Sequence, residues 1–265
     1  MSTVYVAGID IGSVTTKVVV LADGIIISQC VTSSGGDYRR AAEQAMTSAL
    51  AKAGLSIDNI SHIVATGFGA ANVPYKAQKV TEITAQARGI HHLFPQARIV
   101  IDIGGQATRV VKVNGQGEPI DFVVSEKCAS GSGRFLEVMA RVLQTPLEEF
   151  GSLSSKSTKQ VQFTTSCAVF AESEAISRIA EGAAKEDILA GVHESMAIKV
   201  VSLVQRVRLE KEVAFTGGGA MDVGLVRSIE DKLGEKLLVP LEPVLTGALG
   251  AALLGGFSHE SYVRV

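Results

Sequence analysis

Apolar and polar positions follow two different periods along this chain, and together they predict an α/β protein. Short apolar runs typical of β-strands lie at residues 4–9, 18–21, 25–31, 60–66, 98–101, 110–113, 120–124 and 213–216. Apolar side chains at helical spacing predict helices at 38–53, 80–93, 135–143, 167–181, 187–207 and 246–257, and another that ends at 233. No linker or low-complexity segment separates these elements, so the length allows either one large domain or two lobes.

The opening pattern of strand, turn and returning strand occurs again about 90 residues later. In both copies the turn begins with the same three residues, Asp10-Ile11-Gly12 in the first and Asp102-Ile103-Gly104 in the second. This repeat indicates an internal duplication.

Composition and charge argue against some classes of binding partner for this chain. The 265 residues carry a formal net charge of −2 and no run of Lys and Arg interleaved with aromatic residues, so we expect no nucleic-acid partner. The apolar N-terminus is broken at Asp10, and the apolar run at 247–257 is shorter than the roughly 18 residues that a spanning helix needs. We therefore expect no secretory signal and no membrane partner. Three cysteines argue against a disulfide framework and predict a cytoplasmic location.

The two Asp-x-Gly turns have the chemistry of phosphate loops. Glycine lets phosphate oxygens approach backbone N–H groups, and an aspartate at a strand end can hold Mg²⁺ or its waters. One such turn is most often a capping aspartate, but two turns and a third glycine loop favour nucleotide binding. Neither a Walker A loop nor a G-x-G-x-x-G fingerprint is present. The candidate nucleotide-binding residues are Gly12, Ser13, Thr15, Lys17, Gly104, Gly105, Gln106, Gly217, Gly218 and Gly219.

Four of these polar residues are candidates for catalysis. Asp10 and Asp102 are expected at the metal and phosphates, and Lys17 can neutralise developing charge. Gln106 either orients the attacking water or hydrogen-bonds the turn, and the sequence leaves both interpretations open.

Two cysteines precede helical patterns. Cys128 stands before the glycine-rich turn at 130–133, and Cys167 is the first residue of the helix predicted at 167–181. A helix N-terminus stabilises a thiolate or an anionic cluster. From spacing alone, buried inert thiols are the favoured interpretation. The alternative is that two related chains supply four ligands to one iron–sulfur cluster. Cys30 lies in an apolar run and is expected in the core. The histidines show no metal-ligand spacing, and Glu174 is expected to complement a helix dipole.

Several motifs resemble one known family. They are Gly8-Ile-Asp-Ile-Gly-Ser13, Thr66-Gly-Phe-Gly69, Ile101-Asp-Ile-Gly-Gly-Gln106, Lys127-Cys-Ala-Ser-Gly-Ser-Gly-Arg-Phe-Leu136, Cys167-Ala-Val-Phe-Ala-Glu-Ser-Glu174 and Thr216-Gly-Gly-Gly219. The chain is similar, nearly end to end, to the BadF/BadG/BcrA/BcrD ATPase family, which includes 2-hydroxyacyl-CoA dehydratase activators and small subunits of benzoyl-CoA reductase.

The resemblance implies an actin-like ATPase fold, shared with acetate and sugar kinases and Hsp70, with two duplicated lobes and ATP in the cleft. We expect the first lobe at residues 1–90, completed by a C-terminal helix at 245–265, and the second at residues 91–244. The resemblance also implies ATP or ADP, Mg²⁺, and one [4Fe–4S] cluster shared in a dimer. Its ligands would be Cys128 and Cys167 of this chain and two cysteines of an identical or paralogous ATPase subunit.

The implied activity is ATP hydrolysis that drives low-potential electrons from ferredoxin or flavodoxin to larger reductase or dehydratase subunits. Short motifs at 130–133, 151–154, 167–169, 193–197 and 257–259 look more like a benzoyl-CoA reductase subunit, which we therefore expect; the alternative is a stand-alone homodimeric dehydratase activator. The second phosphate loop carries Ala107 where the activator pattern has Asp, which leaves open how Mg²⁺ is held. Competing interpretations are a small-molecule kinase on the same fold and a non-enzymatic nucleotide-gated scaffold.

Overall fold

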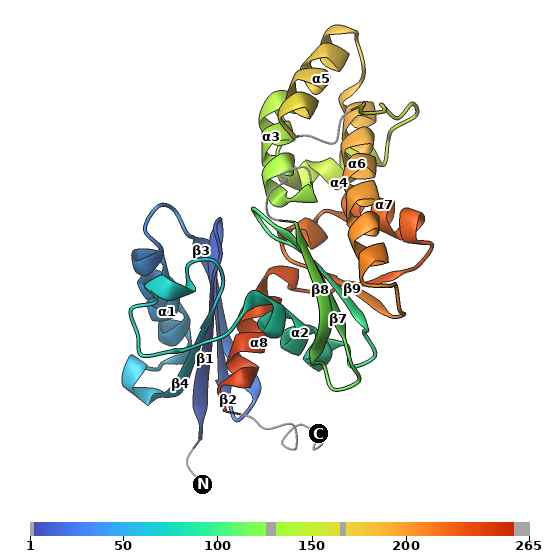
Figure 1. Ribbon diagram of the computed structural model, residues 1–265. Coiled ribbons are helices and arrows are strands. Elements are labelled where there is room, and N and C mark those ends of the chain that lie inside the picture. Colours follow the sequence, from blue (N-terminus) through green and yellow to red (C-terminus); the bar gives the residue numbers. More distant parts are fainter. Residues whose placement is uncertain (1–2, 126–130, 165–167, 257–265) are drawn as a thin grey trace. The chain divides into compact units, whose positions relative to one another are not determined.

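A computed structural model describes residues 3–125, 131–164 and 168–256 of the chain (Figure 1). The described residues form two compact units. Unit 1 contains residues 3–96, 113–119 and 244–256, and unit 2 contains residues 97–112, 120–125, 131–164 and 168–243. Each unit is built around its own five-stranded mixed sheet with helices packed on it, so the predicted α/β class is confirmed. The lobe boundaries expected from the sequence stay a prediction.

The sheet of unit 1 has the strand order β3-β2-β1-β4-β5. Its strands are β1 (Tyr5–Ile11), β2 (Thr15–Ala22), β3 (Ile25–Ser33), β4 (Ile60–Thr66) and β5 (Gln78–Lys79). β1 and β2 pair antiparallel through a tight turn, whereas β1 and β4 pair parallel. Because β2 is covered on both faces, its residues from Val18 to Leu21 are all buried, as a continuous apolar run predicts.

Two helices, α1 (Tyr38–Ala53) and α8 (Thr246–Leu254), pack on this sheet, and α2 (Glu82–Leu93) packs mainly against α8. Val18 and Val20 pack on the α1 side, while Val19 and Leu21 pack with α8 residues, as the two-residue period of a strand requires. α8 comes from the end of the described chain, yet it lies beside α2 and against β1 (Figure 1). Small residues allow α8 and α2 to pack closely, because a side chain at Gly250 of α8 would overlap the Ala85 carbonyl of α2.

The sheet of unit 2 repeats this topology in the order β10-β9-β6-β7-β8. Its strands are β6 (Ile99–Ile103), β7 (Thr108–Val113), β8 (Pro119–Ser125), β9 (Val213–Thr216) and β10 (Leu237–Leu238). β6 pairs antiparallel with β7 and parallel with β9, as β1 does with β2 and β4. The internal duplication predicted from the two turns therefore extends to all the strands of both sheets.

Unit 2 carries more helical structure than unit 1. The helices are α3 (Gly133–Leu143), α4 (Phe150–Ser154), α5 (Ala168–Ala180), α6 (Lys185–Arg206) and α7 (Val223–Leu233). Phe135, Met139, Phe150, Met196 and Phe215 are buried in one apolar core shared by α3, α4, α6 and β9. None of the helices in the described part of the chain is both long and apolar enough to cross a membrane.

Candidate functional site

The first phosphate loop of the sequence analysis lies where β1 ends in unit 1. Asp10 and Lys17 are direct partners in the β1–β2 register, and Lys17 Nζ lies 3.1 Å from Asp10 Oδ2. Asp10 is 6% exposed. The N–H of Gly12 donates to the Thr15 carbonyl over 3.0 Å and closes the turn. Two of the predicted catalytic residues are thus joined in one nearly buried ion pair at a strand end.

The second loop, in unit 2, has the same construction. Asp102 and Arg109 are direct partners in the β6–β7 register, and Arg109 Nη1 lies 3.2 Å from Asp102 Oδ2. The N–H of Gly104 donates to the Ala107 carbonyl over 2.9 Å. Arg109 was not predicted as a site residue from the sequence. The signal was available, because a cation stands seven positions after the aspartate in both loops.

A third element of the duplication comes from the neighbouring parallel strands. Gly67 follows β4 with φ +93°, and Gly217 follows β9 with φ +82°. A side chain at Gly67 would overlap Asp10 Oδ1, and a Cβ at Gly217 would lie 2.5 Å from Asp102 Oδ1. Each aspartate is therefore covered by a glycine in the left-handed region, which excludes other residue types.

Two buried oxygen atoms in unit 1 have no hydrogen-bond partner among the described residues. They are Thr66 Oγ1 and Gln86 Oε1. Thr66 is the register partner of Asp10 on β4. Gln86 is 7% exposed, and a Cβ at Gly247 would lie 3.1 Å from Asp10 Oδ2 and 3.3 Å from Gln86 Nε2.

Buried polar atoms are normally satisfied, so Thr66 Oγ1, at the register partner of Asp10, suits a further polar ligand such as a metal-bound water. Neither residue was predicted as a site residue, although Thr66 opens one of the family-like motifs, because only tertiary packing brings them to the loop.

The remaining predicted loop residues lie at the turns themselves. Ser13, Thr15, Gly104 and Gly105 are partly exposed. Gln106 is exposed and its side chain makes no hydrogen bond with the described residues, so its role stays a prediction.

Unit 2 contains a direct connection from its phosphate loop to α3. The carbonyls of Gly104 and Gly105 accept hydrogen bonds over 2.9 Å from the backbone N–H groups of Gly133 and Arg134. The Thr108 hydroxyl donates to the Gly131 carbonyl. The second phosphate loop is thus hydrogen-bonded to the first turn of α3.

The two predicted cluster ligands, Cys128 and Cys167, lie outside the described residues. Within the described part of the chain, no group of three or more His, Cys, Asp and Glu side chains could hold a metal ion. Cys30 is a free thiol that is only partly buried and packs against the core of unit 1, so it lies at the edge of the core in which it was expected. Glu174 does more than complement a helix dipole, because its carboxylate accepts hydrogen bonds from Thr164 N at 3.0 Å and from Thr164 Oγ1 at 3.1 Å.

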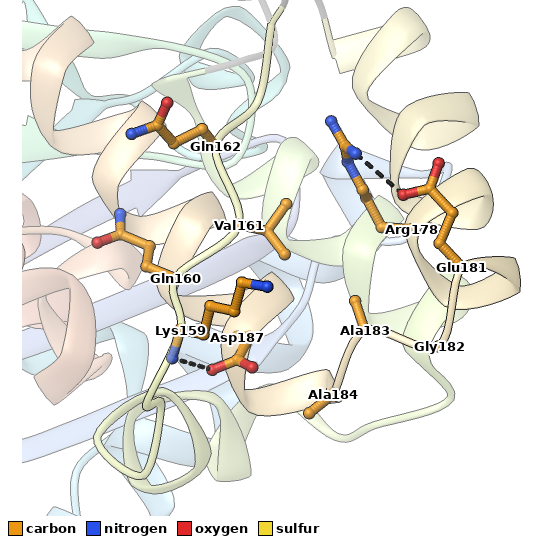
Figure 2. A pocket seen from close by; sticks show the side chains of 10 residues that line it. All are labelled: Lys159, Gln160, Val161, Gln162, Arg178, Glu181, Gly182, Ala183, Ala184 and Asp187. Atoms are coloured by element: carbon orange, nitrogen blue, oxygen red, sulfur yellow. Dashed lines mark hydrogen bonds and ion pairs between the residues drawn. The ribbon is translucent and has the colours of Figure 1, made fainter.

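A separate cavity of about 500 Å³ lies in unit 2 between the segment that precedes α5, the end of α5 and the start of α6 (Figure 2). Asp187 is one of the residues that line this cavity, and it accepts hydrogen bonds from the backbone N–H of Lys159 at 2.9 Å and from the Ser157 hydroxyl at 2.7 Å. These bonds hold the pKa of Asp187 below the ordinary carboxyl value of 3.8. None of the residues predicted for nucleotide binding lines this cavity.

Comparison with known proteins gives one consistent family. The model of the BadF/BadG/BcrA/BcrD ATPase family matches residues 7–255. The 2-hydroxyisocaproyl-CoA dehydratase activator of Clostridioides difficile is 40% identical over 94% of this chain and 94% of its own length. The activator of lactoyl-CoA dehydratase of Anaerotignum propionicum is 41% identical over 94% of this chain and 96% of its own.

A subunit of the benzoyl-CoA reductase of Thauera aromatica is also similar, at 32% identity over 98% of this chain and 95% of its own. The lower identity favours the dehydratase activator, which was the alternative in the sequence analysis, over the expected reductase subunit. Among solved structures, the activator of the 2-hydroxyisocaproyl-CoA dehydratase from Clostridium difficile with bound ADPNP superposes with a TM-score of 0.91 at 39% identity, over 94% of this chain and 93% of that one. The actin-like ATPase fold implied by the resemblance is thereby confirmed.

Proposed function

Because this chain belongs to the BadF/BadG/BcrA/BcrD ATPase family, we propose that it is the ATP-hydrolysing activator of a 2-hydroxyacyl-CoA dehydratase. The observation that carries the proposal is the similarity to two dehydratase activators, at 40% and 41% identity across 94% of the chain. The solved relative with bound ADPNP adds support for a nucleoside triphosphate as ligand.

The loops described above are suited to Mg²⁺-ATP. Asp10 and Asp102 are nearly buried carboxylates, each fixed by a cross-strand cation and ready to hold Mg²⁺ or its waters. The orphaned Thr66 hydroxyl oxygen, at the register partner of Asp10, would provide an additional acceptor at the first loop. The glycine loop at 217–219 would take the nucleoside. Bound Mg²⁺ would neutralise charge on the transferred phosphoryl group, and Lys17 and Arg109 would keep the two carboxylates in place.

ATP turnover by the purified full chain tests the first part of the proposal. Asp10→Asn keeps the size of the side chain but removes its charge, and we expect phosphate release to fall by about 10²-fold or more. Asp58→Asn is the matched control, because Asp58 is an exposed aspartate of the same unit. Unchanged turnover in Asp10→Asn would rule out the role of Asp10 in ATP hydrolysis.

The electron-transfer part of the proposal concerns the cysteines. The family resemblance supports one [4Fe–4S] cluster between two copies of this chain, held by Cys128 and Cys167 of each. Such a cluster would supply one-electron transfer to the dehydratase. Iron and acid-labile sulfide in anaerobically purified protein should reach about two of each per chain. Cys128→Ser and Cys167→Ser should abolish iron binding and leave nucleotide binding intact, whereas Cys30→Ser should retain both, since Cys30 is partly buried against the core of unit 1.

The partner distinguishes the activator from the reductase subunit. We expect the native protein to purify anaerobically as a homodimer and to start 2-hydroxyacyl-CoA dehydration when mixed with a dehydratase, ATP and reduced ferredoxin or flavodoxin. Co-purification with a different ATPase chain and two larger subunits that reduce benzoyl-CoA would instead establish the second candidate, for which the similarity to the Thauera aromatica reductase is the supporting observation.

A further inference from the structure

A buried histidine connects three helices of unit 2 behind the glycine loop. His193 of α6 is 2% exposed. Its Nδ1 lies 3.1 Å from Ser154 Oγ at the end of α4, and its Nε2 lies 2.9 Å from Asp222 Oδ2 just before α7. These are the residue types of a hydrolase triad, but a side chain at Gly224 would come within 2.6 Å of His193 Cε1. The ring is therefore packed in, with no space for a substrate, and its role is structural support.

Asp222 is the residue through which His193 reaches the loop. Its second oxygen, Oδ1, caps α7 by accepting hydrogen bonds from the N–H groups of Gly224 at 2.9 Å and Leu225 at 3.2 Å. The Asp222 N–H donates to the Gly219 carbonyl over 3.3 Å. The His193–Asp222 hydrogen bond thus fixes the point where the turn Gly218–Met221 ends and α7 begins.

The beginning of the same loop is held by a different anchor. The Thr216 hydroxyl donates to the Pro243 carbonyl over 2.7 Å, and the Gly217 N–H donates to the same carbonyl over 3.1 Å. Between the two anchors, Gly218 is exposed, and a Cβ there would meet no atom within 4 Å. Hydrogen bonds therefore fix both ends of the loop, while the backbone at Gly218 is exposed between them. This arrangement is expected of a backbone that binds a flat ligand.

We propose that His193 is a positioning residue for the nucleoside half of ATP. The inference rests on the proposed ATPase function and adds a residue that does not touch the nucleotide. His193 holds Asp222, Asp222 fixes the end of the loop at 217–221, and the loop is thereby pre-organised for the nucleoside. Without the His193–Asp222 hydrogen bond, the loop must be ordered when the nucleotide binds, and the free energy that this ordering costs lowers the affinity. The phosphate loops still perform hydrolysis.

The test is the steady-state ATPase kinetics of His193→Phe in the full chain, together with titration by a fluorescent ADP analogue. Phenylalanine fills the ring's space without hydrogen bonds. We expect KM for ATP and the Kd for the ADP analogue to rise about tenfold, with kcat within about twofold of the original protein. Affinity for ADP should fall as much as affinity for ATP, because both contain the same nucleoside. His62→Phe, at an exposed histidine on β4, is the matched control and should change neither parameter.

A conservative variant separates positioning from general stability. In Asp222→Asn the amide oxygen can still cap α7, and the amide N–H can donate to His193 Nε2 if the ring adopts its other neutral tautomer and donates from Nδ1 to Ser154. We therefore expect a much smaller rise in KM than in His193→Phe, about threefold or less.

Two results would overturn the role of His193 alone. One is a folded His193→Phe protein whose KM and Kd stay within twofold of the original; the other is a fall in kcat at unchanged KM, which reports lost folded protein. A wild-type chain that neither binds nor hydrolyses ATP would overturn the proposed function itself, and this role with it.

Discussion

Arg109→Met removes the cation from the ion pair of the second phosphate loop. The Arg109 and Asp102 side chains are 11% and 6% exposed and 3.2 Å apart. Methionine occupies much of the same space, so the main consequence is a buried carboxylate without its cation. We expect the variant to fold, with lower stability and lower ATP turnover.

The magnitude follows from the burial of the pair. Breaking a buried ion pair by removing one partner costs about 3–5 kcal/mol. The two side chains are nearly but not fully buried, so we expect the lower part of this range or slightly less, about 2–3 kcal/mol. For a unit of this size that loss corresponds to a decrease in Tm of roughly 5–10 °C. ATP turnover should fall by about tenfold or more, because the carboxylate is no longer held in one orientation.

Thermal unfolding followed by circular dichroism, at pH 8 and at pH 5.5, measures this effect. The stability deficit should be smaller at pH 5.5, because protonation removes the charge that the missing cation leaves unpaired. In the double variant Arg109→Met/Asp102→Asn the buried charge is absent, so at least half of the lost stability should return while turnover stays low.

The control is Arg39→Met, which breaks an exposed pair with Glu43 whose side chains are 67% and 49% exposed. Its cost should stay below about 1 kcal/mol. The reasoning is refuted if Arg109→Met costs no more than this control, or if the double variant is as unstable as the single one.

Three further predictions follow from local contacts. Gly250→Ala places a methyl group against the Ala85 carbonyl and should lower the stability of unit 1 by about 1–3 kcal/mol or more in thermal unfolding, whereas Gly36→Ala, with open space around it, should cost less than about 1 kcal/mol. Thr66→Val removes a buried hydroxyl that has no partner among the described residues, so the free energy of unfolding should stay the same or rise by about 1 kcal/mol while ATP turnover falls. A variant that loses both stability and turnover would contradict a ligand role for this oxygen. The lowered pKa of Asp187 means that its hydrogen bonds stabilise the fold above the ordinary value of 3.8 and are lost as the pH falls through the folded value, so Asp187→Asn should reduce stability at pH 7 and have little effect near pH 2.

The helices and strands that could be predicted from the sequence are those defined by residues close together along the chain. The helix Tyr38–Ala53 and the strands Ile60–Thr66 and Val213–Thr216 have the predicted bounds, since apolar periodicity and turn residues define them locally. The strand β2 begins earlier than predicted, at Thr15, because its polar first residues pair with the end of β1. The two-residue strands β5 and β10 were not predicted, since so short a segment has no measurable period.

The parts of the candidate site that escaped prediction depend on contacts between distant segments. Arg109 acquires its role only through the register of β6 and β7, and Gln86 approaches Asp10 only because α2 packs beside α8. The sequence showed no metal-ligand spacing for His193 and offered it only as part of a family-like motif, and spacing along the chain does not reveal Ser154 and Asp222 as its partners. The preference for a reductase subunit relied on a few short motifs, whereas identity over the whole chain favours the activators.

The duplicated loops carry the same charges but differ in the side chains around them. Both aspartates have a cross-strand cation and a covering glycine. After that glycine, unit 1 has Phe68, whose ring packs edge-on against Tyr38 with centroids 6.0 Å apart, while unit 2 has the bare Gly218. Phe68 is 65% exposed, whereas a Cβ at Gly218 would meet no atom within 4 Å, so the two loops differ in the neutral residue that follows the covering glycine. This difference supports the proposal that the nucleoside binds at the loop of unit 2. Thr66 Oγ1, a buried oxygen without a partner among the described residues, belongs to unit 1, at the register partner of Asp10. A duplicated sequence thus produces two loops with the same charges, and the neutral residue after the glycine is the position at which they differ.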